Sequence, residues 1–403
     1  MELTRKQEEG LRIAVSRYRD NKKYTVISGY AGTGKSTLIS YIISALNLNP
    51  EFDVAYIAYT GKASEVLRRK GCANAMTAHK LLYHTRKTPQ GGFITVPKQS
   101  IGDFKIIVVD EVSMLPTKMW FLLLRYGIHI LACGDPGQLP PIARKDEEPL
   151  RILDHPHIFL DEVMRQAQDS EIIRLSMNIR EHKPIEYFDG AEVKVIPKDT
   201  VSTGMYQWAD QILTATNAER FKVNKIMREL LGRGASPEPG DKVISLSNHW
   251  DIFSADGEAN LVNGTIGYLG EECNKIDIHY PIKTFYKFSN PVPILRANFI
   301  SEIGEEYEPL NIDYTALTTG KVFLNNREEY DLYMAKQRVH KEPFPQEPLE
   351  FNYGYAITVH RAQGSEWDKI LVVEEKFPFD LEEHTRWLYT AVTRAQSKLV
   401  LAR

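Results

Sequence analysis

Residues 24–37, YTVISGYAGTGKST, place a glycine-rich loop between an apolar run and a helical pattern. The run Tyr24–Ser28 is rich in β-branched residues and predicts a buried parallel strand. A full match to G-x-x-x-x-G-K-[ST] follows from Gly29 to Ser36, and a helix is predicted from Lys35 to Leu46. Such a loop turns successive backbone N–H groups towards a phosphate, and the helix N-terminus adds a positive dipole. The sequence therefore predicts a nucleoside triphosphate site in an α/β domain; a glycine-rich turn without a ligand is the alternative.

The loop and the helix before it carry the groups expected to hold the nucleotide. Lys35 can reach the β- and γ-phosphates, and the hydroxyl of Ser36 can ligate Mg²⁺. The residues expected to contact the nucleotide here are Gly29, Ala31, Gly32, Thr33, Gly34, Lys35, Ser36 and Thr37. Upstream, Thr4 predicts a helix N-cap. Gln7 on that helix carries an amide that could read the N6/N7 edge of adenine, although a surface glutamine is more often only solvated.

Two further predicted strands end in residues suited to hydrolysis. The apolar run Lys105–Val109 ends in Asp110 and Glu111, which is a Walker B pattern. Asp110 would hold Mg²⁺ through water, and Glu111 would orient the attacking water. The next strand, residues 129–133, ends in GDPGQLPP, where Gln138 could contact the γ-phosphate or its water. Ligands gather outside the carboxyl ends of parallel strands, so these groups are expected to converge.

Other predicted strand ends carry candidates for contact with a polyanion. A strand over residues 53–58 leads into TGKA, where Thr60 and Lys62 could touch a phosphate backbone. The alternative is a helix cap and a solvated lysine. His79 lies at a further strand-to-helix junction. Outside the first domain, Arg165 and Arg394 are the candidates for an arginine at the γ-phosphate, a group that accelerates hydrolysis by roughly 10³ to 10⁵.

Composition bounds the architecture and the partners. A chain of 403 residues is too long for one compact core, and about two to four domains are expected. The net charge of −3 argues against coating by nucleic acid but leaves room for a narrow basic channel. The three cysteines fit neither a disulfide framework nor a zinc site. With no signal peptide and no apolar membrane span in the sequence, we expect a cytosolic protein without membrane contact.

The pattern of elements predicts an α/β fold with interruptions. Residues 1–160 read as a first α/β domain that carries a small hairpin at about 83–103, with its turn at Gly91–Gly92. Residues 161–240 and 349–403 read as a second α/β domain, which includes a helix over residues 386–395. Between them, residues 241–348 lose helical periodicity and predict an all-β insertion.

In this order the motifs resemble those of superfamily 1 helicases, most closely the 5′-to-3′ group that includes phage Dda and RecD-type helicases. Gln7 falls at the Q motif, and the motifs numbered I, Ia, II and III match GYAGTGKST, TGKA, VVDEVSM and GDPGQLPP. Residues 77–82 resemble the family's next DNA-contacting motif after Ia. Met164-Arg165-Gln166 resembles motif IV, TVHRAQGSEW at 358–367 resembles motif V, and YTAVTRA at 389–395 is motif VI with Arg394 as its arginine finger.

The resemblance implies an ATP- and Mg²⁺-dependent motor that translocates on single-stranded DNA and unwinds forks in replication, recombination or repair. It implies two RecA-like domains, a strand-separating pin at the hairpin and an SH3-like insertion. Gly364 and Glu366 join the nucleotide contacts. The residues expected to touch DNA are Thr60, Lys62, His79, Thr358 and His360, with Phe93 as the wedge at the fork. We expect a monomer in the cytoplasm (the host cytoplasm for a phage protein), with a single-stranded-DNA-binding or replication protein as a partner.

Three alternatives remain open from the sequence. The chain could be a RecD-like motor subunit of a larger recombination complex. It could act on RNA, because the contact to the 2′-hydroxyl that separates RNA from DNA is not visible in sequence. It could also be a nucleotide switch without translocation, although GDPGQLPP together with Arg394 argues against a switch.

Overall fold

The computed structural model of the chain describes residues 3–87, 93–140, 150–257, 260–278, 291–321, 348–377 and 380–403. These residues belong to two compact units. The first comprises Met1–His84, Pro97–Arg220 and Ile357–Arg403, and the second comprises Thr85–Val96 and Phe221–Ala356. Among the described helices, none has both the length and the apolar character needed to cross a membrane. The predicted domain boundaries at residues 160, 240 and 348 stay predictions.

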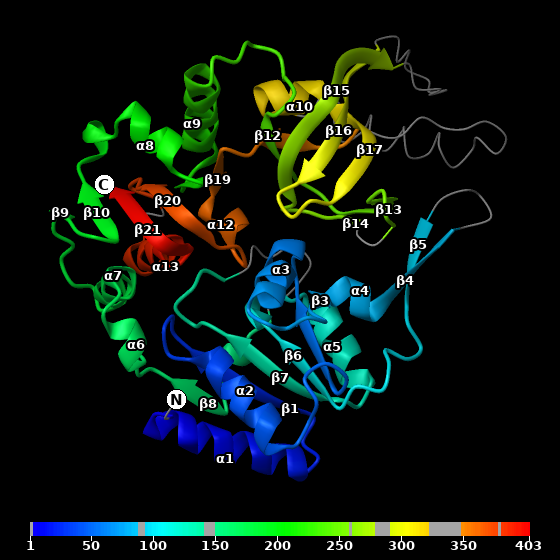
Figure 1. Ribbon diagram of the computed structural model, residues 1–403, viewed down its shortest axis with the longest axis vertical. Coiled ribbons are helices and arrows are strands. Elements are labelled where there is room, and N and C mark those ends of the chain that lie inside the picture. The colour runs from blue at the N-terminus through cyan, green and yellow to red at the C-terminus, as the bar shows by residue number, and fades with distance from the viewer. Residues whose placement is uncertain are drawn as a thin grey trace. The chain divides into compact units, whose positions relative to one another are not determined.

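The first sheet has six parallel strands in the order β3-β2-β6-β7-β1-β8 (Figure 1). Its strands are β1 (Tyr24–Gly29), β2 (Val54–Ala58), β3 (Met76–Thr77), β6 (Ile106–Val109), β7 (His129–Gly134) and β8 (Ile158–Leu160). Its helices are α1 (Arg5–Arg19), α2 (Lys35–Ala45), α3 (Gly61–Arg69), α4 (Ala78–Leu82) and α5 (Thr117–Arg125), with a 3₁₀ turn at Val112–Met114. The predicted strands β1, β2, β6 and β7 are present, each within one residue of its expected bounds.

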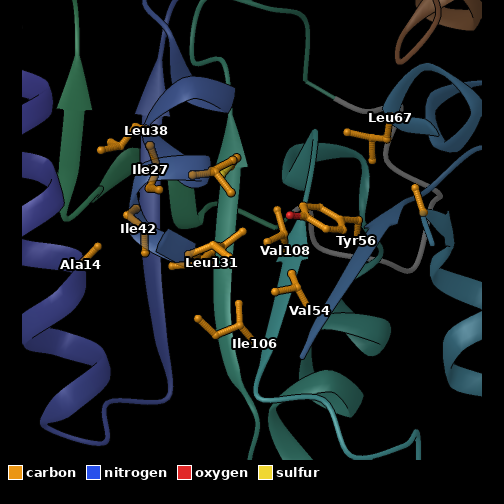
Figure 2. Close-up of a cluster of buried hydrophobic side chains, with 14 of the residues drawn as sticks. Ala14, Ile27, Leu38, Ile42, Val54, Tyr56, Leu67, Ile106, Val108 and Leu131 are labelled. Atoms are coloured by element: carbon orange, nitrogen blue, oxygen red, sulfur yellow. The ribbon is translucent and has the colours of Figure 1, made fainter. Parts of the chain in front are cut away.

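Both faces of this sheet are buried, which explains why its strands are apolar without alternation. Ile27, Val54, Ile106, Val108 and Leu131 belong to one buried cluster with side chains of α1, α2 and α3 (Figure 2). The strand residues that alternate with them pack with α4 and α5 on the opposite face. The sheet is therefore held as the middle of three layers, and the strand ends that carry polar groups are fixed relative to one another.

The second sheet has the order β19-β11-β20-β21-β10-β9 and is parallel from β11 to β10. Its strands are β9 (Phe188–Asp189), β10 (Val193–Ile196), β11 (Gln211–Thr214), β19 (Ala356–Thr358), β20 (Trp367–Val373) and β21 (Ala395–Ala402). The helices of this part are α6 (Arg165–Gln168), α7 (Glu171–Arg180), α8 (Thr203–Trp208), α9 (Asn217–Leu230), α12 (Val359–Ala362) and α13 (Leu381–Val392), with a 3₁₀ turn at Lys198–Thr200. A further 3₁₀ turn, Ile152–Asp154, precedes β8 and packs on the first sheet. The predicted α/β pattern is therefore present twice.

One predicted helix has different bounds. Residues 386–395 were expected to be helical, but α13 begins at Leu381, where Asp380 caps it, and ends at Val392. Arg394 consequently lies in the turn between α13 and β21. A turn frees its side chain from the helical repeat, which matters for the site described below.

The second unit is built on a five-stranded antiparallel sheet in the order β17-β16-β15-β12-β18. Its strands are β12 (Lys242–Ser245), β15 (Ile266–Ile278), β16 (Val292–Ser301), β17 (Glu306–Asp313) and β18 (Phe351–Tyr353), with helix α10 (Tyr314–Thr319). Two-stranded sheets pair β13 (His249–Phe253) with β14 (Asn260–Leu261), and β4 (Tyr83–Lys87) with β5 (Phe93–Pro97). The predicted β-rich segment and hairpin strands are thus present. The hairpin turn at Gly91–Gly92 lies outside the described residues, and the SH3-like and pin assignments stay predictions.

The start of the β-rich segment is fixed by a buried ion pair. The carboxylate of Asp241 is fully buried and accepts from Arg228 Nε and Nη2 at 3.1 and 3.2 Å. The hydroxyl of Tyr355 and the backbone N–H of Glu238 donate to the same carboxylate at 2.9 and 2.8 Å. Asp241 therefore ties together α9, the loop at residues 231–240 and the segment before β19.

Asp241→Ala should destabilise the chain by about 3–5 kcal/mol, because it leaves the Arg228 guanidinium buried and unpaired. Glu272→Ala is the matched control: it breaks an ion pair with Arg296 whose side chains are 45% and 50% exposed, and we expect it to cost less than about 1 kcal/mol. The measurement is the free energy of unfolding in urea. Equal losses for the two variants would contradict the account.

Candidate active site

The glycine-rich loop has the backbone that a phosphate cradle requires. It follows β1 and enters α2, whose N-cap is Gly34. Gly32 and Gly34 have φ of +74° and +77°, a left-handed conformation that side chains other than glycine rarely adopt. A Cβ at Gly34 would also collide with Met164 and with the amide of Gln7. The two glycines are therefore required both by the backbone and by the packing around it.

Lys35 is held against the carbonyls of its own loop. Its Nζ donates to Gly29 O at 2.7 Å and to Tyr30 O at 3.0 Å. Thr33 is buried and closes the same turn, since its Oγ1 donates to Tyr30 O at 2.8 Å. Ser36 lies exposed in the first turn of α2. The ammonium and the hydroxyl predicted to meet phosphate and metal thus lie at the same loop-to-helix junction.

Gln7, on α1, is hydrogen-bonded to the backbone of the glycine-rich loop. Its side chain is fully buried, and its Nε2 donates to Thr33 O at 3.1 Å. Its Oε1 accepts from the backbone N–H of Thr4 at 3.0 Å, which completes a capping box at the start of α1. The expectation of a mostly solvated glutamine is therefore wrong. Both ends of the amide have partners within the chain, and its reading of adenine stays a prediction.

Asp110 and Glu111 follow β6 and form a partly buried acidic pair. Burial raises the pKa of Asp110, against which the charge of Lys35 acts. Burial also raises the pKa of Glu111, and here Arg394 opposes the shift. Glu111 has φ +48°, a left-handed conformation that costs a non-glycine residue about 1–3 kcal/mol. Its Oε1 accepts from Gln138 Nε2 at 3.3 Å. Gln138 thus lies beside Glu111, and its predicted contact with the γ-phosphate or its water stays a prediction.

The donors at this junction suit Mg²⁺. Ser36 and Asp110 offer a hydroxyl and a carboxylate, which are hard oxygen ligands. Within the described ranges there is no cluster of three or more His, Cys, Asp or Glu side chains that could hold a metal by itself. A site with so few protein ligands fits an ion that takes its remaining ligands from phosphates and water, as Mg²⁺ does.

Arg394 reaches this acidic pair from the second sheet. Its side chain is 4% exposed, and its Nη2 lies 4.0 Å from Glu111 Oε1. Its Nε donates to Thr390 O at 3.1 Å, and its Nη1 donates to Ser365 O at 3.4 Å. The guanidinium is thus held by backbone carbonyls and aimed at the carboxylate. Arg165 begins α6, but its side chain lies outside the described residues, so its contact with the γ-phosphate stays a prediction.

Gln363, Tyr389 and Thr390, to which the sequence analysis gave no role, connect the two sheets. The backbone N–H of Leu139, in the loop after β7, donates to Thr390 Oγ1 at 2.8 Å, and Leu139 O accepts from Gln363 Nε2 at 2.6 Å. Tyr389 OH accepts from the backbone N–H of Ala31 at 2.8 Å and donates to Asp135 Oδ2 at 2.7 Å. All three flank predicted site residues in motifs V and VI, and that neighbourhood was the available signal.

Residues predicted to touch DNA from α3 lie against motif V. Thr60 caps α3, as its Oγ1 accepts from Ala63 N at 3.2 Å. Lys62 Nζ lies 5.8 Å from the centre of the Trp367 ring. The bland alternative of a cap therefore holds for Thr60, whose contact with DNA stays a prediction. A Cβ on Gly364 would lie 3.4 Å from Thr60 Oγ1, so the two segments pass closely.

Glu366 is engaged by α3 as well. Its carboxylate lies 3.2 Å from Lys70 Nζ and accepts from Gln396 Nε2 at 2.9 Å. The nucleotide contacts predicted for Glu366 and Gly364 stay predictions, because the described contacts of both residues are with α3, with Met114 and with β21 rather than with the phosphate loop.

His79 lies between two tyrosine rings. Its ring centre is 5.8 Å from Tyr59 and 5.8 Å from Tyr83. Burial lowers the pKa of His79 to about 4, so it presents a neutral ring at neutral pH.

On the second sheet, Thr358 is buried as the N-cap of α12, and burial lowers the pKa of His360. Phe93 begins β5, but its side chain lies outside the described residues, and its role as a wedge stays a prediction.

The low pKa of His79 predicts a pH-dependent stability. Between its folded value of about 4 and the unfolded value of 6.5 the unfolded chain binds more protons, so acid favours unfolding. The contribution is fully present above pH 6.5 and is lost as pH falls towards 4. At pH 5 it should lower the free energy of unfolding by about 2 kcal/mol. His79→Gln removes this part, so urea unfolding at pH 7.5 and 5 should show a smaller loss in the variant. Parallel losses would contradict the assignment.

Comparison with known families agrees with this geometry. The profile of an AAA domain matches residues 2–194, and that of a UvrD-like helicase C-terminal domain matches residues 353–402. The first match covers the phosphate loop, Asp110, Glu111 and Gln138. The second covers Gly364, Tyr389 and Arg394. The two profiles therefore meet at the residues that the structure brings together.

Individual relatives point the same way. The chain is 26% identical to the ATP-dependent RecD2 DNA helicase of Deinococcus radiodurans, over 94% of this chain and 47% of that protein. It is 28% identical to the ATP-dependent DNA helicase dda of Enterobacteria phage T4, over 35% of this chain and 33% of that protein. The chain thus aligns with less than half the length of either relative.

Among solved structures, the Pif1 helicase from Bacteroides in complex with ADP-AlF3 and ssDNA aligns with a TM-score of 0.52 at 16% identity, covering 100% of this chain and 93% of that one. This match shows a shared fold. In its motifs and in these family matches, the chain is similar to the superfamily 1 helicases of the 5′-to-3′ group that includes the RecD-type and Dda helicases.

Proposed function

We propose that the chain is an ATP-driven DNA helicase that moves 5′ to 3′ along single-stranded DNA and separates duplex DNA at forks. The observation that carries the proposal is the approach of Arg394, from the second sheet, to within 4.0 Å of Glu111 on the first. A nucleotide held by Lys35 would then be contacted from both sheets. Its hydrolysis would change how the two sheets hold each other, which is what a translocating motor requires.

The chemistry follows from the residues at the junction. Lys35 and the loop N–H groups bind and orient the phosphates, and Arg394 supplies positive charge where charge develops on the γ-phosphate. Glu111 orients the attacking water, and the hydrogen bond from Gln138 fixes the orientation of its carboxylate. Mg²⁺, held by Ser36 and Asp110, would neutralise charge on the phosphates when bound.

The DNA contacts in the proposal involve the strand ends of both sheets. Lys62 is a cation near the junction of α3 and motif V, while His79 offers a neutral ring beside Tyr59 and Tyr83. Such a surface would hold bases by stacking and the backbone by a few charges, so binding should be sequence-tolerant and salt-dependent. Thr60, Thr358 and His360 complete the proposed path, and Phe93 would separate the strands.

The biological setting is part of the same proposal. A DNA motor of this kind would serve replication, recombination or repair as a monomer in the cytoplasm (the host cytoplasm if the chain is phage-encoded), beside a single-stranded-DNA-binding or replication protein. The support is the named activity of the relatives RecD2 and dda. No described contact identifies the protein partner or the oligomeric state.

Single-stranded DNA should stimulate the ATPase activity of the purified chain at least tenfold, and duplexes with a 5′ tail should be unwound faster than those with a 3′ tail. Matched single-stranded RNA is the comparison that separates a DNA motor from an RNA motor. An ATPase indifferent to any nucleic acid would contradict the helicase and favour a nucleotide switch. A preference for 3′ tails would contradict the direction.

Arg394→Ala should lower kcat for ATP by about 10³ or more with a small change in KM, because the guanidinium acts on charge that develops in the transition state. The matched control is Arg386→Ala on α13, whose guanidinium pairs with the exposed Glu382 at 3.1 Å. We expect that variant to keep kcat within twofold. Comparable kcat values for the two variants would show that Arg394 does not reach the γ-phosphate.

A further inference from the structure

Tyr389 bridges the phosphate loop and the loop after β7 through one hydroxyl. The oxygen accepts the Ala31 N–H at 2.8 Å, and its single proton goes to Asp135 Oδ2 at 2.7 Å. Tyr389 and Asp135 are 1% and 3% exposed, so water does not compete for these bonds. Burial, reinforced by Asp135, raises the pKa of Tyr389 well above its ordinary value, which keeps the donor proton in place.

The ring of Tyr389 has little freedom to move. A Cβ on Gly137 would lie 3.1 Å from Tyr389 Cε1 and 3.4 Å from Tyr30 Cδ1, so the tyrosine rings pack on bare backbone there. The guanidinium of Arg180 lies over the ring of Tyr30, with its Cζ 3.8 Å from the ring centre. Packing of the ring therefore fixes the position of the Tyr389 hydroxyl. The ring stays in place, while the hydrogen-bond partners of the hydroxyl can change.

Asp135 connects this hydroxyl to the catalytic side chains. Its Oδ1 accepts the Gly137 N–H at 2.8 Å, which shapes the turn that presents Gln138. Gln138 in turn donates to Glu111. A continuous chain of hydrogen bonds and short backbone segments thus runs from Ala31 through Tyr389 and Asp135 to the residue that orients the attacking water.

We propose that Tyr389 is a positioning residue that senses the terminal phosphate by giving up the Ala31 N–H to it. Ala31 belongs to the loop whose N–H groups cradle phosphates. A phosphate oxygen is anionic, and a charged acceptor binds an N–H about twice as strongly as the neutral phenol oxygen does. The terminal phosphate would accept the hydrogen bond from the Ala31 N–H in place of Tyr389. Tyr389 would then keep only its hydrogen bond to Asp135. Occupancy of the phosphate loop is thereby passed to Asp135 and Gln138.

The inference rests on the proposed ATP site but not on the action on DNA, so its test uses nucleotide alone. Tyr389→Phe removes the competitor for the Ala31 N–H while keeping the ring. The affinity for a fluorescent non-hydrolysable ATP analogue should rise several-fold, while the affinity for fluorescent ADP, which lacks the terminal phosphate, should stay within twofold. An unchanged ratio of the two affinities would overturn the sensing role.

The kinetic consequence is a split between kcat and KM. In Tyr389→Phe, Asp135 loses a donor and the Gln138 turn is less well held, so kcat should fall about tenfold without a rise in KM. Tyr126→Phe is the matched control, since it loses one hydroxyl bond, to Lys98 O at 2.6 Å, away from the site. It should leave kcat within twofold. A rise in KM with kcat unchanged would indicate a purely structural tyrosine.

A double-mutant cycle guards against misfolding. Tyr389→Phe leaves the buried carboxylate of Asp135 with one hydrogen-bond donor fewer. Asp135→Asn removes the charge of that carboxylate, so the double variant should be at least as stable to heat as the phenylalanine variant. If both residues act through the same bond, the double variant should lose no more kcat than the worse single variant. Additive losses would contradict the relay. Failure of DNA to stimulate the wild-type ATPase would count against the helicase proposal only.

Discussion

Two partly buried carboxylates next to each other at the end of β6 set the central constraint on this structure. Burial disfavours the anionic form of both Asp110 and Glu111. Lys35 and Lys70 act against this at Asp110, and Arg394 and Lys35 act against it at Glu111. Arrangements that keep cations near the acidic pair are therefore electrostatically favoured. A bound nucleotide with its metal ion would change the charge around the pair directly.

The loop after β7 turns this electrostatic constraint into a mechanical one. Gln138 touches Glu111, and Leu139 is held at its N–H by Thr390 and at its carbonyl by Gln363. Asp135 is bound by Tyr389. Gln363 comes from the segment before β20, and Tyr389 and Thr390 come from α13, which follows β20. A change at the phosphates would therefore reach β20 and its neighbours without passing through the rest of either core.

The sequence predicted the parts of the site that depend on local chain geometry. The phosphate loop, the Asp110–Glu111 pair and Gln138 each follow an apolar strand, and parallel strands bring their ends to one edge. The sequence did not predict the bonds of Gln7 to Thr33 and of Tyr389 to Ala31, because these partners are 26 and 358 residues away and are brought near by packing. The position of Arg394 shows the same limit. Its motif was recognised, but the helix before it stops at Val392, so the turn that aims the side chain was missed.

The central claim is that one nucleotide is held from both sheets. The most direct measurement is a crystal structure of the chain with Mg²⁺, a non-hydrolysable ATP analogue and a single-stranded oligonucleotide. The account predicts Lys35 and the guanidinium groups of Arg394 and Arg165 within hydrogen-bonding distance of the terminal phosphate, with the Ala31 N–H turned from Tyr389 to that phosphate. A nucleotide bound by the first sheet alone, with Arg394 still on the carbonyls of Thr390 and Ser365, would contradict it.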